Sequence, residues 1–433
     1  MEQNLNIAEK SFSNEWWEKF VTATNGFSGC TVRKNMFNKS QLETFHKYVV
    51  NTIRTITSNE DRIDDARVGL WFNHDPNIDT KTFFKNHPIP ENSNIQEWIY
   101  AIFQREVTYG LTMNFAESHN DELSDEIHRY IAPYLEKHGI PVEGINTTLI
   151  VGNYGWTPIG IHNDKRGEYI IHFHLGPGDK DMYIWDEQKA IKKGFVPRQP
   201  VENVSDYMND YDRKYTFGKG DLFSMPGRCV HIGNTKEFSV GIIIQFNMSS
   251  LKNLSKRLWL DLNHKIISHK NEKKILPLPP YKETRHHEYN KMIMEHLKYY
   301  NVNAKNKVSD ILKDSYRDHK LGLLSNGGYI RAPFVNKEKL LMAYKNQDKK
   351  SDFRLRSTAR KILYYIKNDT IYIFSNNNKF SIKNHPSYTK LIELLNNKEI
   401  INYAEVIADE RKLIPFIKML YMNLGVSFLS EPE

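Results

Sequence analysis

Residues 160–178 read GIHNDKRGEYIIHFHLGPG and place three histidines and an aspartate around a short apolar run. His162 and Asp164 form an H-x-D pair, whereas His172 and His174 form an H-x-H pair. Residues two apart on a strand point to the same face of a sheet, so either pair can supply two ligands to one metal ion. The two pairs predict different metal sites, and the rest of the chain must decide between them.

The residues around this stretch, from about 146 to 250, predict an all-β domain. Short β-branched and aromatic runs are separated by Gly, Pro and Asp, a pattern that indicates a β-sandwich or barrel. The runs are TTLIVGNYG, EYIIHFHL, DMYIWD, KYTFG, DLFSMP and FSVGIIIQFNM. Residues 187–214 interrupt the pattern as a long insertion, and loops of this length in compact domains are usually functional or disordered.

Helical patterns lie on both sides of the β region. The first hundred residues contain SQLETFHKYVVNTIRTI, which has the spacing of an amphipathic helix. The run VTYGLTMNFA then alternates like a strand, and DELSDEIHRYIAPYLEKHG predicts a helix that stops at Gly139. The helical period returns from 251 to about 345, with a proline-rich break at ILPLPPY.

The last eighty or so residues form a separate unit. The run ARKILYYIKNDTIYIFSNNNKFSI predicts paired strands around a turn at Asn368 and Asp369. Two helical segments follow, YTKLIELLNN and ERKLIPFIKMLYMNLG. Helices beside a small β-hairpin are typical of a winged-helix-like module.

The bulk composition limits the classes of protein to consider. At 433 residues the chain is long for one domain. The formal net charge is +8, but Lys and Arg are spread along the whole chain, which favours solubility over nucleic-acid binding. Cys30 and Cys229 are too few for a disulfide framework or a thiolate zinc site. No run approaches the roughly 20 apolar residues of a membrane span, and the first residues lack an apolar signal core, so we expect a cytoplasmic protein.

An H-x-D triplet is a weak signal by itself, and the chain contains a second copy. His119-Asn120-Asp121 precedes a predicted helix, where Asn120 or Asp121 is better interpreted as the helix cap. The copy at 162–164 lies between two predicted strands instead, so its two side chains can converge on one ion.

A third ligand can come from FGKGDLFSMPGRCVHIGNT, where His231 follows a strand and a Pro-Gly turn. Two histidines and one carboxylate on one face leave coordination positions open, an arrangement that suits non-haem Fe(II) and oxygen chemistry. The alternative set combines the two H-x-H histidines with His231 and leaves Asp164 without a role.

Two spans resemble the metal-binding halves of the JmjC and cupin-like 2-oxoglutarate oxygenases. In TPIGIHNDKRGEYIIHFHLGPGDKDMYIW, H-x-D is followed by a strand, a Gly and a strand that opens with Lys. In FGKGDLFSMPGRCVHIGNTKEFSVGIIIQFN, a Gly-Asp pair, a Pro before the distal His and a returning apolar strand occur in the family's order. The resemblance implies a double-stranded β-helix core, Fe(II) held by His162, Asp164 and His231, and 2-oxoglutarate as co-substrate.

The same resemblance assigns the 2-oxoglutarate lysine to Lys180. The family needs a cation there because the distal carboxylate enters a largely dehydrated barrel, where an unpaired charge is costly. Two extra residues between Gly176 and Lys180 make this alignment looser than that of the metal ligands. No Arg lies between His231 and Arg257, which favours the branch that uses lysine. Supporting hydrogen bonds are expected from Thr157, Tyr154, Gln245 and Asn247, and His172 and His174 become barrel-wall residues.

The resemblance implies a dioxygenase that consumes O2 and hydroxylates an unactivated C–H bond. Relatives that halogenate carry a small residue at the position of Asp164, so this carboxylate favours hydroxylation. The layout after residue 250 also resembles the bacterial ribosomal-protein hydroxylase branch, in which a helical segment mediates dimerisation and a winged helix follows. It implies a homodimer that acts on a peptide or protein side chain, although an amino-acid-derived metabolite fits nearly as well.

We therefore expect an α+β protein with a double-stranded β-helix (cupin or jelly-roll) core. The expected parts are a mainly helical N-terminal region (1–100), a JmjC/cupin-like catalytic domain (101–250), a helical segment (251–345) and a winged-helix-like domain (346–433). Two other functions stay open. One is a cupin-like binding or structural module whose C-terminal unit contacts nucleic acid, and the other is an H-x-H cupin enzyme independent of 2-oxoglutarate.

Overall fold

The structure is a computed structural model. It describes residues 11–73, 75, 78–91, 93–164, 167–196, 203–248, 251–266, 308–346, 352–397, 400–404, 406 and 413–429. The chain divides into two compact units, one made of residues 1–248 with 322–433 and the other of residues 249–321. No helix among the described residues is long and apolar enough to cross a membrane.

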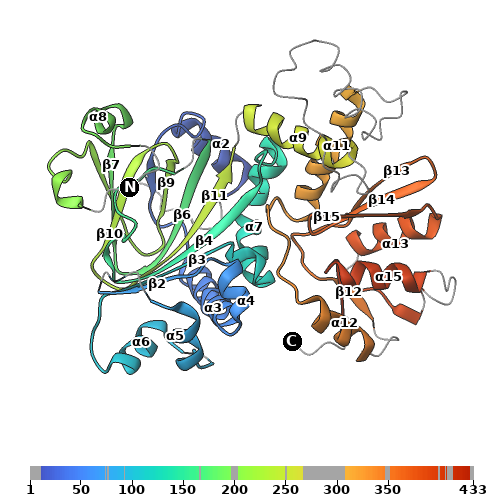
Figure 1. Cartoon of the computed structure of the whole chain (residues 1–433), viewed down its shortest axis with the longest axis horizontal. Coiled ribbons are helices and arrows are strands. Elements are labelled where there is room, and N and C mark those ends of the chain that lie inside the picture. The colour runs from blue at the N-terminus through green and yellow to red at the C-terminus, as the bar shows by residue number, and fades with distance from the viewer. Residues whose placement is uncertain are drawn as a thin grey trace, which may run out of the picture. The chain divides into compact units, whose positions relative to one another are not determined.

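Eight antiparallel strands in two facing sheets form the centre of the larger unit (Figure 1). The first sheet contains, in spatial order, β9 (Leu222–Pro226), β6 (Glu168–Pro177), β11 (Ser239–Asn247) and β4 (Ile145–Gly152). The second contains β5 (Gly155–Trp156), β10 (Val230–Thr235), β7 (Lys180–Trp185) and β8 (Arg213–Phe217). As the chain runs from β4 to β11 it passes back and forth between the sheets, which is the order of a double-stranded β-helix. The predicted fold class is confirmed.

Three further strands extend the first sheet to seven strands. β1 (Thr31–Arg33) pairs with β9 at one edge, whereas β3 (Tyr109–Asn114) and β2 (Gly69–Phe72) continue the sheet beyond β4 at the other. The N-terminal residues therefore complete the large sheet and share one hydrophobic core with it.

Helices cover the outer face of this large sheet (Figure 1). They are α2 (Asn14–Ala23), α3 (Lys39–Thr57), α4 (Glu60–Asp65), α5 (Thr80–Asn86), α6 (Ile95–Phe103) and α7 (Asp121–His138). Alternation along β6 separates two environments, because Tyr169, Ile171 and Phe173 pack against the helices while Ile170 points into the barrel beside residues of β7 and β9. His172 and His174 share the inward face of Ile170.

The local signals at α7 behave as predicted. Asn120 is the N-cap and accepts a hydrogen bond from the Leu123 backbone N–H at 2.9 Å. Gly139 follows the last turn with φ +86°, a conformation that favours glycine. The second H-x-D triplet is thus structural, and its His119 is buried with Nε2 3.2 Å from a carboxylate oxygen of Asp65.

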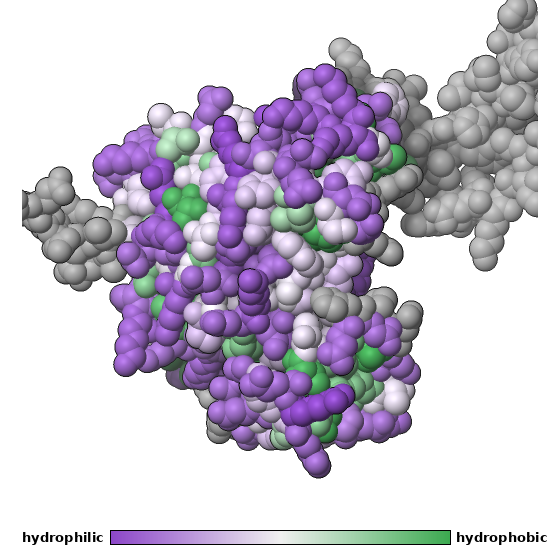
Figure 2. All heavy atoms as spheres, turned by 90° about the vertical axis from the view of Figure 1, so that its left-hand side faces the viewer, coloured by the Kyte–Doolittle hydropathy of each residue, from purple (hydrophilic) through white to green (hydrophobic). Residues whose placement is uncertain are grey.

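The insertion after β7 begins with α8 (Glu187–Lys192) and includes a short 3-10 turn, η2 (Val204–Asp206). Trp185, Phe195 and Val230 form a small core between this insertion and the outer face of the second sheet. The side of the molecule with α8, β7 and β10 is mainly hydrophilic, with small separate hydrophobic patches (Figure 2).

The smaller unit contributes α9 (Leu251–Ile266) and the start of α11 (Val308–Ser325) to the described residues. The predicted helices LSKRLWLDLNHKII and VSDILKDSY fall on α9 and α11 and are confirmed. The break ILPLPPY and the predicted helix YNKMIMEHLKYY lie outside the described residues.

The C-terminal module has a hydrophobic core of its own. Its helices are α12 (Lys337–Asn346), α13 (Pro386–Asn397) and α15 (Leu413–Met422), and β12 (Phe353–Leu355) pairs with β16 (Val426–Phe428). A three-stranded meander completes it, with β13 (Leu363–Lys367), β14 (Thr370–Ser375) and β15 (Asn378–Lys383). Asn368 and Asp369 have φ values of +50° and +57° between β13 and β14, so the predicted turn is confirmed.

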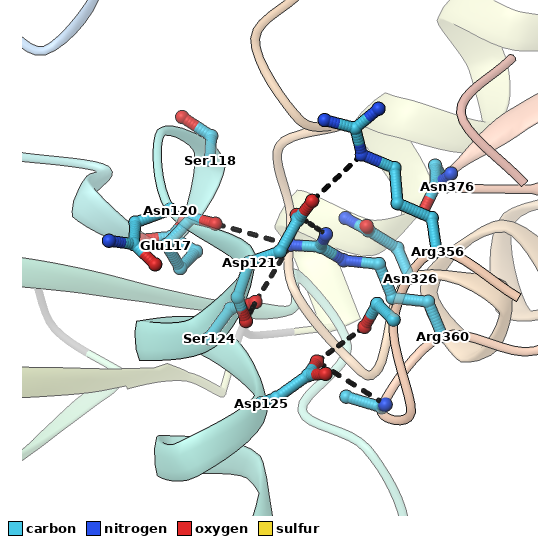
Figure 3. Close-up of polar contacts among 12 residues, drawn as sticks. Glu117, Ser118, Asn120, Asp121, Ser124, Asp125, Asn326, Arg356, Arg360 and Asn376 are labelled. Carbon is cyan, nitrogen blue, oxygen red and sulfur yellow. Dashed lines mark hydrogen bonds and ion pairs between the residues drawn. The ribbon is translucent and has the colours of Figure 1, made fainter. Parts of the chain in front are cut away.

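Salt bridges connect this module to α7 (Figure 3). The buried Arg360 guanidinium pairs with Asp121 and also donates to the Ser124 hydroxyl at 3.0 Å. Arg356 Nε donates to the other Asp121 oxygen at 2.8 Å. Burial opposes ionisation of Asp121, but the two arginines outweigh it and lower the pKa of this carboxyl. Removing one partner of a buried ion pair typically costs about 3–5 kcal/mol, so these contacts fix the module to α7.

Glu117 lies beside this connection, in the 3-10 turn η1 (Ala116–Ser118). Its side chain is fully buried and accepts a hydrogen bond from the Thr147 backbone N–H of β4 at 2.8 Å. Burial raises the pKa of Glu117 to about 7, although the Thr147 hydrogen bonds and Arg360 act in the opposite direction.

We predict that Glu117→Gln removes part of the pH dependence of stability. The unfolded chain releases this proton near pH 4.5, whereas the folded protein keeps it until about pH 7, so wild-type stability falls as the pH rises between these values. The raised pKa corresponds to a decrease of about 3 kcal/mol in the free energy of unfolding across this window. Urea unfolding measured below and above this window should show that Glu117→Gln increases the free energy of unfolding, relative to the wild type, by more at the higher pH. An equal increase in the free energy of unfolding at both pH values would contradict the raised pKa of Glu117. The same pattern in the exposed control Glu122→Gln would also contradict it.

Candidate metal site

The two histidines of the proposed metal site lie opposite each other on two segments joined by backbone hydrogen bonds. His162 lies in the loop after β5, and His231 lies in β10. His162 N–H donates to the His231 carbonyl at 3.0 Å, and His231 N–H donates to the His162 carbonyl at 2.7 Å. This isolated bridge brings the two rings together with a centroid separation of 4.3 Å.

A backbone carbonyl orients each imidazole. His162 Nδ1 is 2.8 Å from the Gly160 carbonyl oxygen, and His231 Nδ1 is 3.0 Å from the Cys229 carbonyl oxygen. A carbonyl only accepts hydrogen bonds, so both Nδ1 atoms carry a proton, and the neutral form of each ring has its lone pair on Nε2. Histidines that bind metals are usually held in this tautomer by such a contact.

Asp164 stands beside this pair, with Oδ2 3.9 Å from His231 Nε2. Burial raises the pKa of Asp164, and His162 partly opposes this effect. Burial, then the charge of His162, holds the pKa of His231 well below its usual value. The site therefore offers a neutral imidazole and a carboxylate whose negative charge is costly to bury without a cation.

The donor set fits an iron ion in its chemistry, because two neutral imidazoles and a carboxylate are the ligands of non-haem Fe(II). In the present conformation no three His, Cys, Asp or Glu side chains of the described residues are close enough together to hold a metal. Two neighbouring ligands at typical bond lengths are about 3 Å apart, so the 3.9 Å between Asp164 and His231 is longer than a bound ion requires.

Lys180 is the other charged group inside the barrel. It is 3% exposed and shares the inward face of β7 with Met182 and with Ile184, which pairs with His231. Its Nζ donates to the Tyr154 hydroxyl at 2.7 Å, and among the described residues no carboxylate forms an ion pair with it. Burial lowers the pKa of Lys180 to about 7. The ammonium group therefore lacks the anion that would compensate its burial.

Gly233 makes the space in which Lys180 lies. A Cβ at this position would stand 2.8 Å from Lys180 Cε and 3.0 Å from the Thr157 hydroxyl oxygen. Thr157 also donates to the Gly233 carbonyl at 3.0 Å. The structure thus brings Lys180, Tyr154 and Thr157 together around one glycine of β10.

Gln245 and Asn247 lie on the inward face of β11 and form a set of hydrogen bonds with β4. Asn247 Nδ2 donates to the side-chain oxygen of Asn146 at 2.7 Å, and the Asn146 amide donates in turn to Gln245. These three residues link β11 to β4. Within the described part of the chain, the side-chain hydrogen bonds of Gln245 and Asn247 go to β4 and to nearby backbone, and none goes to Lys180.

His172 and His174 line the barrel wall. Their rings contact each other and both pack against Phe217. His174 Nε2 is 2.7 Å from the Gly178 carbonyl oxygen, and His172 Nε2 abuts Gly241, where a Cβ would come within 2.2 Å. Burial holds both pKa values below the usual range, so both rings are neutral.

Trp71 lies near the site, although no sequence pattern predicts its position. Trp71 of β2 packs with Ile150 and Tyr154, and its ring centroid lies 6.0 Å from that of Tyr154. A Cβ at Gly110 would clash with the indole at 2.1 Å, so this glycine provides the space for Trp71. Trp71 reaches the barrel through strand pairings that are distant in sequence, which periodicity does not reveal.

No family model and no curated protein matches the sequence. Among solved structures, the chain is similar to YcfD of Escherichia coli, at 10% identity and a TM-score of 0.48 over 95% of this chain and 97% of that chain. A second YcfD structure, described as a ribosomal oxygenase in complex with cobalt and succinic acid, has 10% identity and a TM-score of 0.45 over 96% and 98%.

We predict that the H-x-D pair, and not the H-x-H pair, binds the metal. Loss of a residue that hydrogen-bonds to a metal ligand typically weakens metal binding by about 10–100-fold. Asp164→Ala removes a ligand itself, so it should weaken Co(II) binding by more than this. His172→Ala, the matched change on the barrel wall, should bind Co(II) nearly as well as the wild type. Titration followed by absorption spectroscopy measures both affinities. Loss of binding in His172→Ala with retention in Asp164→Ala would assign the site to the H-x-H set.

Proposed function

We propose that this protein is an Fe(II)- and 2-oxoglutarate-dependent oxygenase that hydroxylates an unactivated C–H bond. The observation that supports this function best is the burial of Lys180 in the same barrel as the two histidines and the aspartate, with no carboxylate partner among the described residues. A cation in that position needs an anion from outside the chain, and a dicarboxylate that reaches the metal ligands meets this need.

The spacing of the two sites suits such a co-substrate. Lys180 lies four residues along β7 from Ile184, which pairs with His231. This separation corresponds to about 13 Å along the strand. The lysine side chain and a five-carbon dicarboxylate together can span it. The charge of Lys180 is also close enough to affect the pKa of His231.

Each group would have a separate task. His162, Asp164 and His231 would hold the iron and leave positions open for the co-substrate and O2. The bound iron would supply the activation of O2 for its reaction with the 2-oxo acid. Lys180 would pair with the distal carboxylate, and the Tyr154 hydroxyl would orient the ammonium group.

We propose a peptide or protein side chain as substrate, with an amino-acid-derived metabolite as the second candidate. The outside of the second sheet supports a large substrate, because Tyr211 of the insertion and aromatic residues of β5 and β7 gather there and are partly exposed. Trp156 and Tyr211 both contact the ring of Tyr183, and Lys214 lies over the same ring at 5.4 Å. The helical segment is proposed to form a homodimer and the C-terminal module to be winged-helix-like.

We predict that Lys180→Ala raises the KM for 2-oxoglutarate by about 100-fold, because losing one partner of a buried charge pair costs about 2–5 kcal/mol. Co(II) affinity should stay unchanged, since Lys180 does not belong to the metal set. Succinate release measures the KM, and the exposed Lys236→Ala is the matched control. A normal KM in Lys180→Ala would exclude Lys180 as the co-substrate residue.

We also predict that 2-oxoglutarate affinity depends on pH through Lys180. Only the protonated amine attracts the carboxylate, and burial lowers the pKa of Lys180 to about 7 in the free protein. The Kd should be nearly constant below pH 7 and rise toward tenfold per pH unit above it. Calorimetric titration at several pH values measures this, with Lys180→Arg as the variant that keeps its charge. A flat profile in the wild type would contradict the lowered pKa.

A further inference from the structure

We propose that Cys30 and Cys229 form a site of oxidative modification, a dithiol that hydrogen peroxide converts into a disulfide. They are the two cysteines of the chain and lie 199 positions apart in sequence. The fold nevertheless brings their sulfur atoms to 3.8 Å from each other. Both residues are half-buried free thiols.

The backbone around both residues suits the bond. Cys30 directly precedes β1, a three-residue strand at the edge of the large sheet, and Cys229 lies in the turn between β9 and β10. A disulfide needs a sulfur separation of about 2.05 Å. The remaining approach of about 1.7 Å can be shared between the end of an edge strand and a turn, which resist displacement less than a central strand.

A cavity lies beside the two segments that carry the cysteines; neither cysteine lines it, but each is partly exposed to solvent. It has a volume of about 550 Å³ and is lined by Phe27 and Ser28 on the side of Cys30 and by Pro226 and Arg228 on the side of Cys229. Cysteines that solvent can reach are the ones most susceptible to oxidation.

The reaction balances with peroxide as the oxidant. One thiol attacks hydrogen peroxide, so the O–O bond breaks, an S–O bond forms and one water leaves. The second thiol then attacks this sulfenic acid, so the S–S bond forms, the S–O bond breaks and a second water leaves. The two sulfurs are oxidised by two electrons in total, and both oxygen atoms of the peroxide are reduced to water.

The bond would also affect the metal site, and this step rests on the proposed function. The Cys229 carbonyl is the group that orients His231 through its Nδ1–H, at 3.0 Å. Drawing Cys229 toward Cys30 moves that carbonyl. Disturbing the outer partner of a metal-binding histidine typically weakens metal binding by about 10–100-fold.

The modification is tested on metal-free full-length protein treated with hydrogen peroxide. The expected result is the loss of both free thiols, an intact mass lower by two hydrogen atoms, a peptide cross-linking the two cysteines, and full reversal by dithiothreitol. The Cys30→Ser variant should gain oxygen instead of losing hydrogen. Thiols that survive treatment, oxidise separately to sulfinic acids in the wild type, or link different chains would overturn the proposal.

The effect on the metal is tested by Co(II) titration of the reduced and oxidised forms. The disulfide form should bind at least about tenfold more weakly and recover after reduction, whereas reduced Cys30→Ser should bind like the reduced wild type. Equal affinity in both redox forms would overturn the coupling to His231. Disulfide formation in a protein that binds no Co(II) in either form would support the dithiol site and reject the proposed function.

Discussion

The pair of backbone hydrogen bonds between His162 and His231 is the contact on which the site depends. It joins the loop after β5 to the middle of β10, two segments that the chain reaches on different turns of the β-helix. Together with the hydrogen bonds from Thr157 to Gly233, it holds the H-x-D loop against β10, whereas Asp164 itself lies in a loop and outside a strand. The carbonyls of Gly160 and Cys229 then set the direction in which the two imidazoles present Nε2.

The alternation of the central strands then decides which side chains meet inside the barrel. One face of β6 carries large apolar groups against the helices, and the other carries two histidines into an interior shared with Lys180. Buried polar groups with incomplete partners are costly to a fold that has apolar residues available for the same space. Their concentration in this one interior is the physical reason for placing the function there.

Much of this could be predicted from local sequence. The strands from β4 to β11, the cap at Asn120 and the turn at Asn368 and Asp369 follow from periodicity and turn chemistry, which act over a few residues. The spacing of two between His162 and Asp164 predicts a shared direction, and the motif around His231 resembles a known family closely enough to pair it with them. Lys180, Tyr154 and Thr157 were chosen by position, and the structure places them together.

The rest depends on contacts between residues far apart in the chain. β1 and β2 are three and four residues long, so their place at opposite edges of the sheet is determined by their partners and not by their own pattern. The approach of Cys30 to Cys229 and the ion pair of Asp121 with Arg360 arise in the same way. Gln245 and Asn247 were also chosen by position, and both form hydrogen bonds with Asn146 of β4, an amide that the pattern does not mark.

The central claim is that a metal at His162, Asp164 and His231 and an anion at Lys180 belong to one site. Thermal unfolding under anaerobic conditions, with Fe(II) and 2-oxoglutarate added singly and together, tests it most directly. A shared site predicts a stabilisation by 2-oxoglutarate that is largest in the presence of iron and disappears in both His162→Ala and Lys180→Ala. No stabilisation in the wild type, or the same stabilisation in His162→Ala, would show that the two groups do not act together.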